Sequence, residues 1–217
     1  THADAFSKTS LALVNGFPAI ATTLGNNIDT TKFLTYAVAS NADGSGAWNV
    51  VTVDSATDAG SQYVSLAVVA GNPAISYVDN AASELRYIRA NDPLGAAWPA
   101  GPNLNVAVKN AIPVAATGAT SMAIIDGHPA IAFRADITSS GDTAYVRALD
   151  PDGATWGPVK TVITAGQSNF VSLAVVAGRP AISSNLTASS YGVRFAVATD
   201  STGATWRDMQ VVGTPSG

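Results

Sequence analysis

Short segments with alternating or wholly apolar side chains recur along the chain, and turn residues separate them. Between residues 60 and 115 the pattern predicts strands at 64–70, 74–78, 85–90 and about 105–108. Gly71-Asn72-Pro73 joins the first two segments; Gly tolerates a positive φ, and Pro fits where a strand begins. The pattern therefore predicts an antiparallel meander of four strands.

This four-strand pattern repeats four times. The segment Ser10-Leu-Ala-Leu-Val-Asn-Gly-Phe-Pro-Ala-Ile20 returns in similar form at 65–75, 121–131 and 172–182. A period of about 50 residues with four strands per repeat is typical of β-propeller blades. We therefore expect one all-β domain, residues 1–217, with four blades at about 6–58, 60–115, 117–166 and 168–213.

The third segment of each repeat carries apolar or large side chains on both faces, as in Leu85, Tyr87 and Ile88. A sheet covered on both faces must lie between neighbours, which favours the propeller. The first strand would line a central axis, since a small residue stands at the same place in each repeat (Ala12, Ala67, Ala123, Ala174). The alternative is that the four blades form part of a larger ring completed by other repeats or a second chain.

Each repeat also contains one tryptophan behind a glycine turn. Three turns share the pattern D-x-x-G-A-x-W, and a fourth is one residue shorter; their ends are Asp92 and Trp98, Asp150 and Trp156, Asp200 and Trp206, and Asp43 and Trp48. The pattern resembles the Asp-box of sialidase-type propellers, although the aspartate stands one residue earlier. The whole repeat looks like the tandem propeller repeats of secreted bacterial proteins. In this turn the Asp would accept backbone N–H groups while the Trp covers it.

The charge balance excludes one large class of partner. The formal net charge is −4, and only 12% of the residues are charged. Nucleic-acid binding needs a basic surface, so we expect no nucleic-acid partner. No apolar run has the length of a membrane span, and the chain has no cysteine. The Thr/Ser/Asn-rich composition favours an extracellular or cell-surface location.

The sequence offers few groups for catalysis. It contains one glutamate, Glu84, and no nucleophile elbow, phosphate loop or metal-ligand cluster. The resemblance implies three arginines, a Tyr/Glu pair and an aspartate on a six-bladed ring, and four repeats are too few for that ring. Glu84 is expected to be a solvated loop residue. We therefore predict that the protein is not an enzyme and has no cofactor; calcium at Asp150 and Asp152 is the weaker alternative.

Polar residues that differ between repeats are the better guide to function, because shared residues build the blade. Ends of the second strands carry Tyr77, Asp79, Arg134, Asp136 and Asn185, which would form a polar patch with aromatic walls suited to a sugar. Arg89 and Arg147, where other repeats have valine, are expected to pair with nearby aspartates.

The predicted function is a non-enzymatic scaffold for a protein or glycan ligand, possibly lectin-like. The alternatives are a degenerate sialidase-like glycan hydrolase and a structural spacer of a surface protein. A closed four-bladed ring would be a monomer, and half of an eight-bladed ring would be a dimer.

Overall fold

The computed structural model describes residues 9–25, 32–55, 63–79, 82–102, 104–107, 119–135, 141–164, 170–186 and 192–212. Within these ranges the chain forms strands and no helix, so no helix there could span a membrane. The chain divides into two compact units, Thr1–Ala107 and Val108–Gly217. We describe each unit by itself.

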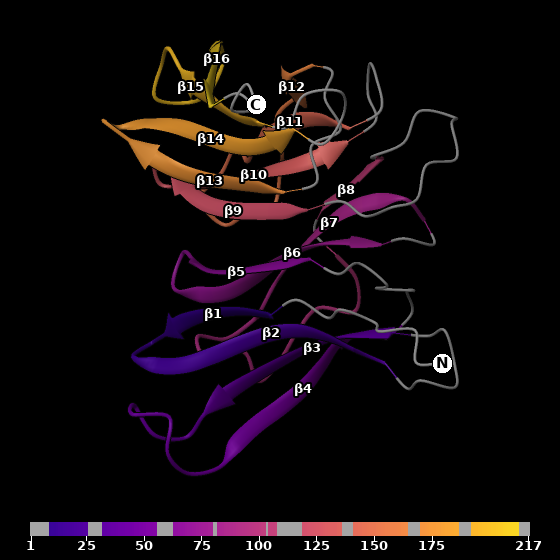
Figure 1. Cartoon of the computed structure of the whole chain (residues 1–217). Coiled ribbons are helices and arrows are strands. Elements are labelled where there is room, and N and C mark those ends of the chain that lie inside the picture. The colour runs from indigo at the N-terminus through magenta and orange to yellow at the C-terminus, as the bar shows by residue number, and fades with distance from the viewer. Residues whose placement is uncertain are drawn as a thin grey trace, which may run out of the picture. The chain divides into compact units, whose positions relative to one another are not determined.

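Each unit contains two sheets of four antiparallel strands, here called blades (Figure 1). Every sheet has its strands in sequence order, as a meander requires. Blade 1 comprises β1 (Thr9–Val14), β2 (Phe17–Gly25), β3 (Lys32–Ala39) and β4 (Trp48–Asp54). Blade 2 comprises β5 (Val64–Val69), β6 (Asn72–Asp79), β7 (Glu84–Arg89) and β8 (Leu104–Ala107).

The second unit repeats this arrangement. Blade 3 comprises β9 (Thr120–Ile125), β10 (His128–Ala135), β11 (Asp142–Arg147) and β12 (Lys160–Ile163). Blade 4 comprises β13 (Val171–Val176), β14 (Arg179–Leu186), β15 (Gly192–Ala198) and β16 (Trp206–Val212). The prediction of an all-β fold with four blades of four antiparallel strands is confirmed.

The first two strands of every blade are joined by a two-residue hairpin turn. Both turn residues have positive φ: Asn15 and Gly16 in blade 1, and Ala70 and Gly71 in blade 2, with the same geometry in the other two blades. This is the type I′ pattern, whose twist matches that of the flanking strands. The turn fixes the register, so that Ala67 faces Ala74 and Leu66 faces Ile75.

The turn between the third and fourth strands is organised by its aspartate. Asp92 accepts the backbone N–H of Leu94 at 3.0 Å, of Ala96 at 3.2 Å and of Ala97 at 2.7 Å. Partial burial pushes the pKa of Asp92 upward, but these hydrogen bonds outweigh it and lower the pKa below its usual value. Asp200 accepts the equivalent N–H groups of Thr202, Ala204 and Thr205.

The tryptophan at the end of this turn packs back onto it. Trp98 Nε1 donates to the carbonyl of Gly95 at 2.8 Å, and Trp156 and Trp206 make the same bond to Gly153 and Gly203. The Trp98 ring also meets Tyr36 of blade 1 edge to face, with centroids 5.3 Å apart. The Tyr36 hydroxyl donates to the carbonyl of Leu94 at 3.1 Å. The turns of blades 2 and 4 therefore also join these blades to the first blade of the same unit, since Tyr145 donates in the same way to the carbonyl of Thr202.

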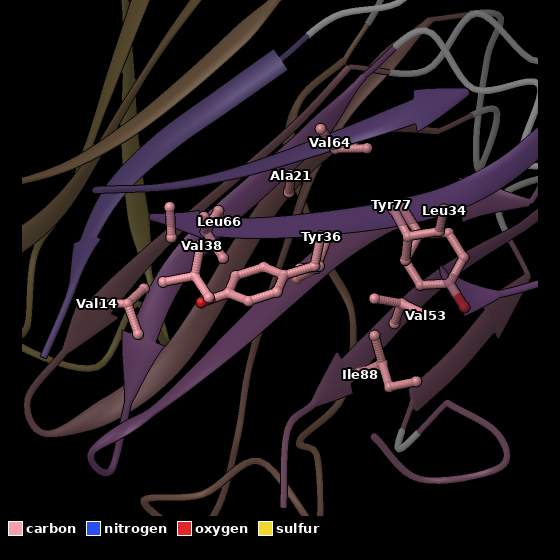
Figure 2. Close-up of a cluster of buried hydrophobic side chains, with 12 residues drawn as sticks. Val14, Ala21, Leu34, Tyr36, Val38, Val53, Val64, Leu66, Tyr77 and Ile88 are labelled. Carbon is pink, nitrogen blue, oxygen red and sulfur yellow. The ribbon is translucent and has the colours of Figure 1, made fainter. Parts of the chain in front are cut away.

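The core of each unit lies between its two blades. In unit 1 it contains Tyr36, Val38 and Leu34 of blade 1 and Leu66 and Tyr77 of blade 2, all buried (Figure 2). The inner strands are also linked directly, because Ser10 Oγ accepts the backbone N–H of Leu66 at 2.9 Å. Ser121 Oγ accepts the N–H of Leu173 in the same way in unit 2.

Candidate functional site

A group of charged side chains lies where β4 and β6 end and β7 begins, at the boundary between blades 1 and 2. Arg86 Nη2 lies 2.8 Å from Asp79 Oδ2 and 3.2 Å from Glu84 Oε2, and Arg86 Nη1 lies 3.6 Å from Asp54 Oδ2. The Tyr77 hydroxyl donates to Asp54 Oδ2 at 2.6 Å. These five residues, Asp54, Tyr77, Asp79, Glu84 and Arg86, are called the Arg86 cluster below.

Strand pairing explains why the cluster forms. Tyr77 faces Arg86 and Asp79 faces Glu84 across the β6–β7 ladder. Asp54 comes from the neighbouring blade as the last residue of β4. The β3–β4 register shifts between Leu34 and Thr35, so that Asp54 pairs with Leu34. Such irregularities redirect side chains at a strand end.

Most of the Arg86 cluster is shielded from solvent. The side chains of Asp79, Asp54 and Arg86 are largely buried, whereas Glu84 keeps 30% of its side chain exposed. Burial opposes the charged form of Arg86, but Asp79, Tyr77 and Glu84 outweigh this and raise its pKa. Burial also raises the pKa of Tyr77, and Asp54 raises it further, so Tyr77 stays protonated and donates its hydrogen bond.

The cluster gathers three carboxylates on one guanidinium, which leaves an excess of negative charge. Carboxylates accept hydrogen bonds strongly, and an arginine offers several fixed donors. Glu84 is the group that a ligand can reach from solvent. Chemically, the arrangement can bind a neutral ligand rich in hydroxyl groups, and carboxylates in pairs can also act as acid and base.

The second unit has no such cluster at the equivalent positions. Arg194 occupies the place of Arg86, and its guanidinium pairs with Asp208 on the next strand. The other four places are taken, by the strand pairing, by residues that carry no charge: Ile163 for Asp54, Ser184 for Tyr77, Leu186 for Asp79 and Gly192 for Glu84. Since the two units share their architecture, the acids of the first unit are not needed to build a pair of blades.

The residues predicted to line a sugar-binding patch have different surroundings. Tyr77 and Asp79 belong to the Arg86 cluster, but Tyr77 is fully buried, so its ring does not present the stacking face that the sequence suggested. Arg134 and Asn185 lie in the second unit. The Arg134 side chain is buried, and Asn185 Oδ1 accepts the N–H of Phe170 at 2.8 Å. Asp136 lies outside the described residues.

Sequence reasoning missed two members of the cluster, Asp54 and Arg86, and set Glu84 aside as a solvated loop residue. Glu84 instead begins β7 and bonds to Arg86. A signal for Arg86 was present, because blades 1 and 3 carry Thr35 and Ala144 at its position. No local pattern distinguished Asp54, whose role depends on the neighbouring blade.

The expectation that Arg89 and Arg147 pair with nearby aspartates is confirmed for Arg147, which pairs with Asp126. Arg89 donates to the carbonyls of Val69 and Ala70 at 2.8 and 2.9 Å. Arg147 donates to the carbonyl of Ile125 at 3.1 Å and lies 3.7 Å from the exposed carboxylate of Asp126. Both arginines hold the first hairpin turn of their blade against the third strand, which is a structural role.

The four turn aspartates are occupied by hydrogen bonds within their own turns. Asp150 accepts from the backbone of Ala154 and Thr155, each at 2.7 Å, and Asp43 accepts from Ser45 at 3.0 Å. Asp152 Oδ1 lies 3.4 Å from the Ala154 nitrogen. Across the described part of the chain, no group of three or more His, Asp or Glu side chains is arranged to hold a metal ion.

Comparison with known proteins gives a match at the level of the fold. No protein-family model and no curated protein sequence matches the chain. Solved structures do match: an endo-1,4-beta-xylanase from Bacteroides thetaiotaomicron aligns with 13% identity and a TM-score of 0.58, over 95% of this chain and 72% of the xylanase. Zg3597, a family 117 glycoside hydrolase of Zobellia galactanivorans, aligns with 14% identity and a TM-score of 0.54, over 99% and 73%.

A subtype N11 neuraminidase-like protein of a flat-faced bat strain (H18N11) aligns with 9% identity and a TM-score of 0.64, over 97% of this chain and 58% of that protein. The sialidase-like propeller fold suggested by the tryptophan turns is therefore supported. Identities of 9% to 14% establish the fold alone.

These neighbours contradict the prediction that the protein is not an enzyme. That prediction held four repeats to be too few for a hydrolase ring, yet nearly the whole chain aligns with propeller glycoside hydrolases. The blade count therefore does not exclude catalysis. The four-bladed chain has the β-propeller fold of glycoside hydrolases.

Proposed function

We propose that this protein binds carbohydrate and that the Arg86 cluster in the first unit is its binding site. The observation that carries the proposal is the difference between the units: five polar or charged side chains converge in unit 1, where unit 2 keeps only the arginine and a serine. Charged groups are costly to bury even when paired. A cluster that the blade architecture does not require is best explained by a ligand.

The chemistry of the cluster suits a sugar. Sugar hydroxyl groups both donate and accept hydrogen bonds, so they match carboxylates and a guanidinium placed side by side. Glu84 provides the accessible acceptor and Arg86, with 14% of its side chain exposed, a partly accessible donor, while the buried Asp79 and Asp54 hold the guanidinium in place. Several structural neighbours are enzymes that act on glycans, which supports this ligand class. An extracellular or cell-surface location belongs to the same proposal.

A second candidate function is hydrolysis of a glycosidic bond. Glycoside hydrolases commonly use a pair of carboxyl groups, one as acid and the other as base or nucleophile. The Arg86 cluster offers three carboxylates, and Glu84 is the one open to solvent. Asp54, in the same cluster, accepts a hydrogen bond from the Tyr77 hydroxyl. This bond would hold the Asp54 carboxylate in one orientation while Glu84 reacts.

Binding is tested on a glycan array and then by calorimetry with the best ligand. We expect Glu84→Gln and Arg86→Met to lower affinity at least tenfold, since each removes a charged hydrogen-bonding group. The matched control is Arg194→Met, which removes the arginine at the equivalent position of unit 2 and should leave affinity unchanged. Thermal unfolding of each variant separates loss of binding from loss of folding.

A blank array for the wild-type protein would contradict the proposal and favour a structural spacer or a protein ligand. Equal loss of affinity in Arg194→Met would also contradict it. Hydrolysis is tested separately by release of reducing sugar from xylan and arabinan and of product from a fluorogenic sialoside. Activity that Glu84→Gln abolishes while sugar affinity persists would assign the cluster to catalysis.

A further inference from the structure

Each blade has two faces that play different parts in packing. Within each unit, the first blade presents a face with Tyr36 and Val14 in blade 1, or Tyr145 and Ile125 in blade 3; we call this the forward face. The second blade of the unit covers it with a face that carries Leu66 or Leu173, which we call the rear face. Forward and rear faces are therefore complementary apolar surfaces.

The rear face of blade 1 is exposed. Leu11 keeps 70% of its surface accessible, whereas Leu66, at the same position of blade 2, keeps 7%. Leu13, Trp48 and Val50 are also exposed. Contiguous exposed apolar side chains of this kind mark interaction surfaces.

The forward face of blade 4 is exposed as well. Val176 keeps 45% of its surface accessible, whereas Val14, its equivalent in blade 1, is fully buried. Val193 and Met209 on the same face are also exposed, and Val193 stands where blade 1 has the buried Leu34. Both exposed faces thus carry the same kind of residues that form the interface between blades inside a unit.

Two exceptions in the repeats match each other. Tyr36 and Tyr145 on forward faces donate their hydroxyl groups to turn carbonyls of the next blade, at Leu94 and Thr202. Blade 4 has Phe195 at this position, without a hydroxyl. The turn of blade 1, from Asp43 to Trp48, is one residue shorter than the others. The forward face of blade 4 therefore does not need a turn carbonyl at the usual position, and the shorter turn of blade 1 can pack against it.

Trp48 is exceptional for the same reason. The other tryptophans donate to a turn glycine, and Trp98 and Trp206 pack on a tyrosine of the preceding blade. Trp48 makes neither contact with any described residue and is exposed. Trp48 also lines an apolar pocket of about 430 Å³, together with Phe17 and Leu94. Phe195 is the residue whose position matches the missing aromatic partner.

We propose that the forward face of blade 4 in one copy of the chain packs on the rear face of blade 1 in a second copy, with Phe195 against Trp48. The contact continues the interface between blades that each unit already contains. It joins two different surfaces, and such contacts form a closed assembly when the last surface meets the first. Two copies supply eight blades, within the range of about four to eight blades known for propellers.

The proposal is tested by light scattering of the purified chain. We expect a dimer with twice the 21.9 kDa mass of the chain. Leu11→Lys and Val193→Lys should each shift the protein to monomer, because each places a charge on one of the joined faces. Leu149→Lys is the control, since Leu149 is a similarly exposed leucine in the turn that follows β11. It should leave the dimer intact.

Mixing the two variants makes the test specific. The Leu11→Lys chain keeps an intact blade 4 face, and the Val193→Lys chain keeps an intact blade 1 face, so an equimolar mixture should recover more dimer than either variant alone. If the wild-type protein is a monomer, a second copy does not cover these faces, and the proposal is overturned. A dimer that survives both lysine substitutions would overturn it too. Circular dichroism confirms that each variant is folded.

Discussion

At the scale of single residues, the glycine three positions before Trp98, and its counterpart before Trp206, serve two purposes. Gly95 and Gly203 both have positive φ, of +73° and +81°. A Cβ atom at either position would also lie 2.6 Å from Cε1 of the tyrosine that packs on the turn, Tyr36 or Tyr145. Burial raises the pKa of both tyrosines, and in Tyr36 the nearby carboxylate of Asp92 raises the pKa further. The neutral hydroxyl therefore remains a donor.

The double role of Gly95 predicts a difference between two glycine substitutions. Gly71 also has positive φ, but no atom lies within 4 Å of its Cβ position. Gly71→Ala should cost about 1–2 kcal/mol for the left-handed backbone alone. Gly95→Ala should cost about 1–3 kcal/mol more, because Tyr36 must move. Urea unfolding measures both, and equal losses would show that Tyr36 adjusts freely.

At the scale of elements, the sequence predicted the strands well. The segments expected at 64–70, 74–78 and 85–90 appear as β5, β6 and β7 with ends shifted by at most two residues. Alternation and turn residues act over a few positions, so they are readable locally. The sequence suggested a positive φ at Gly71 alone. In the structure both turn residues have positive φ, since Ala70 has a φ of +45°.

The hairpin turns therefore predict a stabilising substitution. Asn15 and Asp126 occupy the first turn position in blades 1 and 3, and these residue types tolerate positive φ better than alanine. We expect Ala70→Asn and Ala177→Asn each to raise the free energy of unfolding by up to about 1 kcal/mol. Asn15→Ala is the reciprocal control and should lower it. A loss of stability in Ala70→Asn, measured by chemical denaturation, would contradict this explanation.

At the scale of the whole molecule, the turn aspartates act together on pH dependence. Partial burial pushes the pKa of Asp150 upward, but hydrogen bonds from Thr155 and Ala154 outweigh it and lower the pKa to about 2. The pKa of Asp92 and of Asp200 is likewise lowered, and in the exposed Asp43 hydrogen bonds from Ser45 lower it.

A carboxyl whose pKa is lower in the folded state binds more protons when the chain is unfolded. Its stabilising contribution is complete above the unfolded pKa of about 4 and is lost as the pH falls through the folded value. We expect the unfolding temperature to drop between pH 4 and pH 2. Asp150→Asn should make this drop shallower while lowering stability at pH 7. An unchanged slope, measured by scanning calorimetry, would contradict the role given to Asp150.

The Arg86 cluster could be predicted only in part, for a reason that belongs to this scale. Tyr77 and Asp79 stood out because they differ between repeats. Asp54 and Arg86 are 32 positions apart in the sequence and meet only because the last residue of β4 in one blade reaches Arg86 in β7 of the next. The prediction that Arg134 and Tyr77 share one patch used only their equivalent positions in the repeats. An ion pair requires the two charged groups to lie within about 4 Å, which repeat position does not show.

The sequence by itself determined the number of repeats, the strands within them and the residues of their turns, because strand alternation and turn conformation depend on neighbouring residues. The tertiary structure decided which side chains meet across blades and which faces remain exposed. Those properties depend on packing between segments far apart in the chain. For that reason Glu84, which resembles a loop residue in the sequence, joins a charged cluster. Trp48, one of four similar tryptophans, is exposed and lacks the hydrogen bond to a turn glycine that the other three make.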